Sequence, residues 1–134
     1  MQKNDRINRV EYPITPGMPD VNCCLFGIGE FWIETKTPIE PKRASTPLFG
    51  SNHRVTIDQI NWHRAQYQAG GASYILIDTD KRLLIVAGRL IEQINNMTIA
   101  ELCVQSEFVR LKPMRKNEWK KLRQCLKHNH LHTK

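Results

Sequence analysis

The amino-acid sequence predicts an α/β fold, in which a mixed central β-sheet is flanked by helices. Two pairs of hydrophobic, β-rich runs separated by short turns predict hairpins of the sheet. Stretches in which apolar residues recur at helical spacing lie between and after these hairpins. The 134 residues fit one domain, residues 1–134, with a core of about residues 6–110 and a basic C-terminal helix and tail over residues 111–134.

The N-terminal half predicts extended segments and a long loop. Residues 6–12 alternate weakly and indicate either a first strand or the end of a helix. Residues 20–26 and 30–36 predict two strands of a hairpin around Gly27. Residues 37–55 form a long connection with three prolines, and a loop of this length in a small domain is usually functional or mobile.

The C-terminal half predicts one clear helix, a second hairpin and further helices. Residues 57–69 have helical spacing and stop at the pair Gly70–Gly71. The runs SYILIDT and RLLIVAG flank a short turn and predict two buried strands. Residues 89–104 predict one or two short helices, and residues 115–127 predict a last helix with lysines on one face and apolar residues on the other.

The composition excludes several classes of protein. No run approaches the ~18 apolar residues needed to cross a bilayer, and the N-terminus lacks the apolar segment of a secretory signal. The four cysteines form no C-x-x-C pair, which favours free thiols in a reducing cytosol over a structural zinc site. We therefore expect a cytoplasmic protein (host cytoplasm, if a bacteriophage encodes it) with no membrane partner and no small-molecule cofactor.

The charge points to a polyanionic partner. The net charge is +7 and the pI about 9.5, which suits nucleic acid better than a membrane. Residues 110–134 hold nine lysines or arginines and one acid, Glu118. For the whole segment, contact with DNA or RNA and a solvated basic tail are both open. For its last few residues we favour the solvated tail. His128, Asn129 and His130 lie there, and adjacent residues do not make the HNH nuclease motif, whose members are spread over a ββα unit.

A pair of acids and a lysine on the first predicted hairpin could form a metal site. Side chains two residues apart on a strand share a face, so Glu34 and Lys36 point the same way. If the two strands pair, Asp20 comes near Glu34, and two such carboxylates repel each other unless a cation lies between them. Oxygen ligands of this kind suit Mg²⁺ or Mn²⁺. The alternative is an exposed strand with a Glu–Lys pair of little energetic value.

The order of these motifs resembles a known nuclease superfamily. Asp20 in "PD" followed by Glu34-Thr35-Lys36 resembles the PD-(D/E)xK superfamily. The stretch "GMPDVNCC…FWIETK…DQINWHRAQYQAGGASYILI" resembles its small Holliday-junction-resolvase-like and VRR-NUC branches, which many bacteriophages contain. The likeness runs from residue 17 to about 88 and implies a restriction-endonuclease-like core. One departure is the short N-terminal region, where the usual first helix and its acidic residue are hard to place.

The resemblance implies roles for individual residues. Asp20 and Glu34 would be metal ligands together with the backbone carbonyl of Thr35. Lys36 would position the attacking water and stabilise the transition state. Glu11 would be the acidic ligand supplied upstream, and its alternative interpretation is an exposed strand residue.

Gln59 would assist near the site in this family pattern. The residues themselves offer another role, because Thr56-x-x-Gln59 is a capping box in which Gln59 bonds back to the backbone. Trp62 follows three residues later, and we expect it to pack in the core rather than to stack on a base. Lys81 and Arg82, at the second hairpin turn, are expected to be solvent-facing charges.

Basic residues could hold the DNA backbone in two places. One group lies in the loop between the Glu-x-Lys strand and the helix, where phosphate contact and plain solvation are both open: Lys42, Arg43, His53 and Arg54. The other group belongs to the C-terminal basic segment: Arg115, Lys116 and Lys120.

These observations together predict a nuclease. The expected activity is Mg²⁺-dependent hydrolysis of DNA phosphodiester bonds, with Mn²⁺ able to substitute. The resemblance suggests branched DNA as substrate, besides duplex, and a homodimer that cuts two strands. The alternative is a non-catalytic nucleic-acid-binding accessory protein with a nuclease-like fold. A third and weaker hypothesis is a restriction-type nuclease with sequence preference, because we see no space in the chain for a separate recognition domain.

Overall fold

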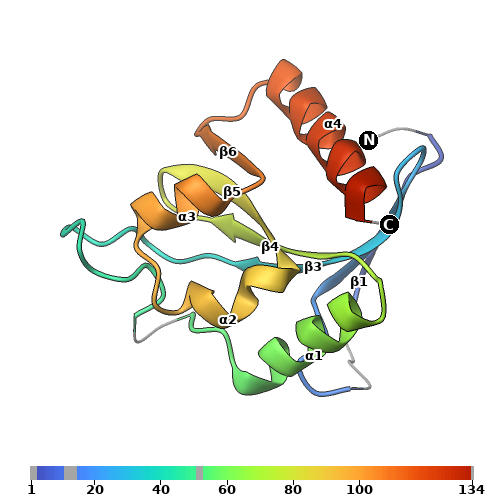
Figure 1. The fold of residues 1–134 in the computed structure, drawn as a ribbon. Helices are drawn as coiled ribbons and strands as arrows, with labels where there is room; N and C mark the ends of the chain where they lie inside the picture. Colours follow the sequence, from blue (N-terminus) through green and yellow to red (C-terminus); the bar gives the residue numbers. More distant parts are fainter. Residues whose placement is uncertain (1–2, 11–14, 51–52, 134) are drawn as a thin grey trace.

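Six strands form one mixed sheet in the computed structural model, which describes residues 3–10, 15–50 and 53–133 (Figure 1). Their order in the sheet follows their order in the chain. Neighbouring strands are antiparallel except β3 and β4, which are parallel. The strands are β1 (Arg6–Arg9), β2 (Val21–Leu25), β3 (Gly29–Lys36), β4 (Ser73–Asp78), β5 (Arg82–Ala87) and β6 (Phe108–Leu111).

Helices cover both faces of this sheet, which confirms the predicted α/β class (Figure 1). The first helix provides the crossover between β3 and β4, because parallel strands cannot be joined by a tight turn. The first three α-helices contribute to one core cluster and the last helix to the other, so they lie on opposite faces. The helices are α1 (Ile57–Gln68), the short 3-10 helix η1 (Gly88–Leu90), α2 (Ile91–Ile94), α3 (Ile99–Gln105) and α4 (Lys116–Thr133).

The alternation of side chains along the buried strands separates the two cores. In β4, Ile75 and Ile77 face α1 to α3, whereas Tyr74 faces α4. In β5, Leu84 and Val86 take the first face, and Leu83 and Ile85 take the second. Because both faces are covered, these strands are apolar on both sides, as the runs SYILIDT and RLLIVAG predicted.

The basic C-terminal helix is docked on the sheet. Leu122 and Leu126 pack into the second core cluster. Beside them, Arg123 donates hydrogen bonds to both carboxylate oxygens of Asp5, at 2.6 and 2.9 Å, and to the carbonyl of Phe26 at 2.8 Å. The helix continues to Thr133, so the prediction of a tail over residues 128–130 is wrong. No glycine or proline interrupts this segment.

Two other expectations differ from the structure. Strand β6 was not predicted, because it is only four residues long and contains an arginine. Arg82 is not a solvent-facing charge: its Nε and Nη2 donate to the two oxygens of the buried Glu40, each at 2.8 Å. The hydroxyl of Thr79 donates to the same carboxylate at 2.7 Å. This network anchors the loop after β3 to the β4–β5 hairpin across 42 residues of sequence.

Residues 6–12 form a strand over their first four positions, and residues 11–14 lie outside the described part of the chain. Among the helices of the described residues, none is long and apolar enough to span a bilayer.

Candidate active site

Pairing of β2 with β3 brings Asp20 to Glu34. Val21 lies opposite Ile33, so one further step along the antiparallel register places Asp20 across from Glu34. The backbone N–H of Thr35 donates to Asp20 Oδ2 at 3.0 Å, which fixes the carboxylate at this strand end. The sequence prediction that these two acids meet agrees with this geometry.

The alternation of β3 directs Glu34 and Lys36 to the face covered by α1. Phe31 and Ile33 belong to the core on the α4 side, so the residues between and after them take the opposite face. Glu34 is buried, with 2% of its surface exposed. Lys36 is partly buried, and its Nζ donates to the carbonyl of Arg54 at 3.4 Å.

Gln59 links the acid and the lysine. Its Nε2 donates to Glu34 Oε1, and its Oε1 accepts from Lys36 Nζ at 3.1 Å. The same Oε1 accepts from the backbone N–H of Thr56 at 3.0 Å, and the Gln59 N–H donates to the Thr56 hydroxyl at 3.2 Å. The capping box and the contact with the site are therefore both present. The cap fixes the start of α1 and so fixes the amide that holds Glu34 and Lys36.

Gly17 sets the approach of the Asp20 segment to α1. Its φ is +79°, and a Cβ at this position would overlap the backbone carbonyl of Asp58 at the start of the helix. Only glycine allows the chain to pass this close in this conformation. Sequence reasoning did not assign this role, although the glycine three residues before Asp20 is the signal that could have indicated it.

Replacing Gly17 with alanine is therefore expected to destabilise the fold and displace Asp20. The matched control is Gly27→Ala, because Gly27 has φ +77° but nothing within 4 Å of its added Cβ. We expect the control to cost about 1–2 kcal/mol and Gly17→Ala to cost roughly 1–3 kcal/mol more. Urea unfolding of both variants measures the difference. Equal losses would show that the close contact with α1 is unimportant.

Burial and a neighbouring carboxylate shift the pKa of Glu34 and leave one of its oxygens without a hydrogen-bond partner among the described residues. Burial raises the pKa of Glu34 to about 8, the neighbouring Asp20 carboxylate adds to the rise, and the charge of Lys36 opposes it. Glu34 Oε2 is buried and has no hydrogen-bond partner among the described residues. A buried oxygen without a partner, next to a second carboxylate, fits a hard divalent cation.

The described residues supply two acids here and not three. Within residues 3–10, 15–50 and 53–133, no group of three or more His, Cys, Asp or Glu side chains is placed to hold a metal. Glu11, the predicted upstream ligand, lies outside the described residues. Asp20 and Glu34 are therefore the two described acids at this site that could contribute to holding a cation.

Aromatic side chains pack between β3 and α1, the two elements that carry the site residues Glu34, Lys36 and Gln59. Trp62 packs edge to face against Trp32, with ring centroids 5.6 Å apart, in agreement with the expected packing role. His63 is fully buried, and its Nδ1 shares a hydrogen bond of 2.7 Å with the Ser73 hydroxyl. Burial lowers the pKa of His63 to about 4.

His63 should give the protein acid sensitivity. The unfolded chain binds a proton near pH 6.5 and the folded chain only near pH 4, so the stability contribution is complete above pH 6.5 and is lost as the pH falls toward 4. We expect wild type to lose roughly 2–3 kcal/mol more than His63→Gln between pH 7 and pH 4.5. Urea unfolding of the two proteins at both pH values measures this difference. An identical pH dependence in the variant would contradict the assignment.

The predicted DNA-contacting residues fall into two separate places. Lys42, Arg43, His53 and Arg54 are exposed on the loop that joins β3 to α1, and the carbonyl of Arg54 contacts Lys36. Arg115, Lys116 and Lys120 are exposed at the start of α4, on the opposite face of the sheet from α1. The structure therefore places Arg54 of the loop group at the candidate site, whereas the α4 group lies on the opposite face of the sheet.

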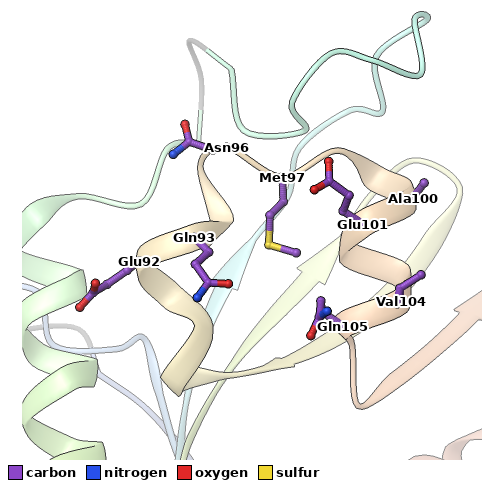
Figure 2. Close-up of a pocket in the computed structure, with 8 residues that line it drawn as sticks. All are labelled: Glu92, Gln93, Asn96, Met97, Ala100, Glu101, Val104 and Gln105. Carbon is purple, nitrogen blue, oxygen red and sulfur yellow. The ribbon is translucent and has the colours of Figure 1, made fainter.

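A cavity of about 640 Å³ lies between α2 and α3 (Figure 2). None of the residues that line it belongs to the candidate site at Glu34. Its two acids already have partners: Glu92 pairs with Arg64, and Glu101 belongs to the capping box of α3 with Thr98. We therefore place the candidate chemistry at Glu34 and not in this cavity.

Comparison with known proteins gives one informative result. No family model matches the sequence, and no curated protein matches it. Seven solved chains match the structure, among them Hjc, a Holliday junction resolvase from the archaeal hyperthermophile Archaeoglobus fulgidus. The likeness has a TM-score of 0.50 and 15% identity, and it covers 75% of this chain and 78% of the resolvase. The chain therefore shares the fold of an archaeal Holliday junction resolvase.

Proposed function

We propose that this chain is a divalent-metal-dependent endonuclease that hydrolyses phosphodiester bonds in DNA, with a preference for branched DNA. The observation that carries the proposal is the buried Glu34 carboxyl, which has Asp20 beside it and is joined to Lys36 through Gln59. The shared resolvase fold supports the choice of DNA and of branched substrates. Residues 1–134 would act as one nuclease domain.

Asp20 and Glu34 would hold the cation, together with the carbonyl of Thr35. Mg²⁺ fits this oxygen set, and Mn²⁺ should substitute for it. When bound, the cation would stabilise negative charge on the attacking and leaving oxygens of the phosphodiester. The partnerless Oε2 of Glu34 supports this assignment, because in the folded protein alone that oxygen has lost water and gained no donor.

Lys36 would orient the attacking water and offset charge on the phosphate. An ammonium group has three donors, and two of those on Lys36 are used by the Gln59 side chain and the Arg54 carbonyl. One donor remains for water or a phosphate oxygen. Gln59 is a positioning residue in this scheme, because it holds Lys36 and Glu34 in fixed relation through the α1 cap.

The exposed cations of the loop after β3 would bind the DNA backbone next to the site. Contacts with phosphates position a duplex without reading its sequence, so binding should weaken steeply with salt. One site per chain cuts one strand at a time, and a homodimer would supply the two cuts needed at a branch.

The test is cleavage of labelled four-way junction, flap, duplex and single-stranded DNA in Mg²⁺, Mn²⁺ or EDTA. The proposal expects metal-dependent cutting, with branched substrates cut fastest. Glu30→Gln is the matched control for Glu34→Gln, because Glu30 lies exposed on the same strand. Cutting that continues in EDTA, or no cutting of any substrate in Mg²⁺ or Mn²⁺, would overturn the proposal.

A non-catalytic DNA-binding role is the second candidate. It is favoured by the presence of only two acids at the site within the described residues. DNA cleavage distinguishes the two functions. Binding of Mg²⁺ and of DNA without any cleavage would support the accessory role.

A further inference from the structure

A groove of about 520 Å³ lies on the opposite face of the sheet, between α4 and the strands β1 and β2. Its apolar walls come from α4 and the two strands: Ile7, Leu25, Trp119, Leu122 and Leu126. Trp119 exposes 52% of its surface and Ile7 53%. The docking of α4 uses Leu122 and Leu126, so the exposed indole is available for another contact.

The charge around this groove is positive. Its single acid, Asp5, is fully buried as a side chain and is engaged by Arg123. Lys116 and Lys120 also line the groove and are exposed, and the ion pairs within the described residues use neither of them. An exposed aromatic ring flanked by unpaired lysines fits a nucleotide, whose base can stack and whose phosphate is an anion.

The edge of the sheet connects this groove to the candidate active site. Leu25 is at the groove and Asp20 is just before the other end of β2, a separation of about 17 Å along an extended strand. The edge strand β1 runs beside β2, with all four residues exposed. Its Arg9 lies opposite Val21, the neighbour of Asp20, so the edge strand carries a cation at the end of β2 that is nearer the site.

We propose that this groove binds an unpaired nucleotide of single-stranded DNA, with the base stacked on Trp119 and the phosphates held by Lys116 and Lys120. The inference rests on the proposed function, because it assumes that the chain binds DNA. It adds a way to recognise branched DNA. A branch has unpaired nucleotides that a continuous duplex lacks, and the groove would hold them while the duplex lies at the Glu34 site.

Binding is tested in EDTA, so that cleavage does not interfere, by fluorescence anisotropy of a labelled oligo-dT and of a blunt duplex. We expect Trp119→Ala to weaken oligo-dT binding roughly 5- to 150-fold and to leave duplex binding unchanged. Trp119→Phe keeps a ring and should restore most of the affinity. Tyr67→Ala is the control, because Tyr67 exposes 56% of its surface on α1, on the other face of the sheet.

The lysines are tested by the salt dependence of the same binding. The double variant Lys116→Gln, Lys120→Gln should reduce the salt slope for oligo-dT by about 1.4, since each phosphate contact on a single strand contributes roughly 0.7. The matched control is Lys121→Gln, Lys127→Gln, which removes equal charge from the same helix outside this groove. Equal slopes for the two double variants would overturn the proposed phosphate contacts.

Other outcomes overturn the groove assignment or separate it from the nuclease activity. Oligo-dT binding that is unchanged in Trp119→Ala, or lost equally on duplex, would overturn it. A wild-type dimer that Trp119→Ala converts to a monomer in sedimentation would overturn it too, since a second chain would then occupy the groove. Cleavage without any Trp119 effect would refute the groove alone. Trp119-dependent binding without cleavage in any metal would refute the nuclease and support the groove.

Discussion

Replacing Lys36 with alanine should lower the single-turnover rate of DNA cleavage by roughly 10²- to 10³-fold, the usual loss when one donor to the transition state is removed. The free donor of Lys36 Nζ is the group that would contact water or phosphate at the site. DNA affinity in EDTA should change little, because the proposed contacts with the DNA backbone come from the loop cations and not from Lys36.

The fold should survive this change, so the loss of rate can be interpreted. Gln59 Oε1 still accepts from the Thr56 N–H, and the α1 cap therefore remains. Lys81→Ala is the matched control, because it removes an exposed lysine from the β4–β5 turn. A Lys36→Ala protein that cuts at the wild-type rate would exclude Lys36 from the chemistry.

Replacing Glu34 with glutamine should raise the free energy of unfolding at high pH, although the same change should abolish DNA cleavage. In the metal-free protein, Glu34 has a pKa of about 8 in the folded state, whereas the ordinary pKa of a glutamate, which we take for the unfolded chain, is about 4.5. The folded chain therefore binds one more proton than the unfolded chain between these values, and the free energy of unfolding falls as pH rises from 4.5 to 8. Glu34→Gln removes this titration. Measured against wild type in EDTA, the variant should gain a few kcal/mol between pH 5 and pH 9.

Urea unfolding at the two pH values measures this gain. Mg²⁺ should then stabilise the wild type at pH 9 and leave Glu34→Gln unchanged, because a ligand that binds only the folded state adds to its stability. Glu30→Gln controls for loss of a carboxylate from the same strand. A stability difference that is independent of pH would show that Glu34 does not carry the buried charge.

The positions of the site residues could be predicted from the sequence, because they depend on the regular geometry of a strand, a hairpin and a helix cap. The two-residue period of a strand puts Glu34 and Lys36 on one face, and hairpin pairing brings Asp20 across from Glu34. The three-residue spacing of a capping box, from Thr56 to Gln59, places Gln59 at the start of α1. Sequence left the cap and the site contact as alternatives for Gln59, and the structure shows that one amide makes both.

Long-range contacts could not be predicted in this way. The close approach of Gly17 to α1 and the pairing of Glu40 with Arg82 join segments about 40 residues apart. A local pattern can mark Gly17 as a special backbone position, but it does not identify the distant partner in either contact. The extent of α4 was underestimated because its histidine-rich end has few of the apolar residues that mark a helix face. Its anchor, the pair of Arg123 with Asp5, spans 118 residues.

The measurement that most directly tests the central claim is single-turnover cleavage of a labelled four-way junction in Mg²⁺ by wild type and Glu34→Gln. Both proteins should bind the junction with similar affinity in EDTA. If Asp20 and Glu34 hold the catalytic cation, the wild type cuts, EDTA stops it, and the variant is inactive. If Glu34→Gln cuts at the wild-type rate, Glu34 does not hold the catalytic cation and the catalytic site lies elsewhere in the chain.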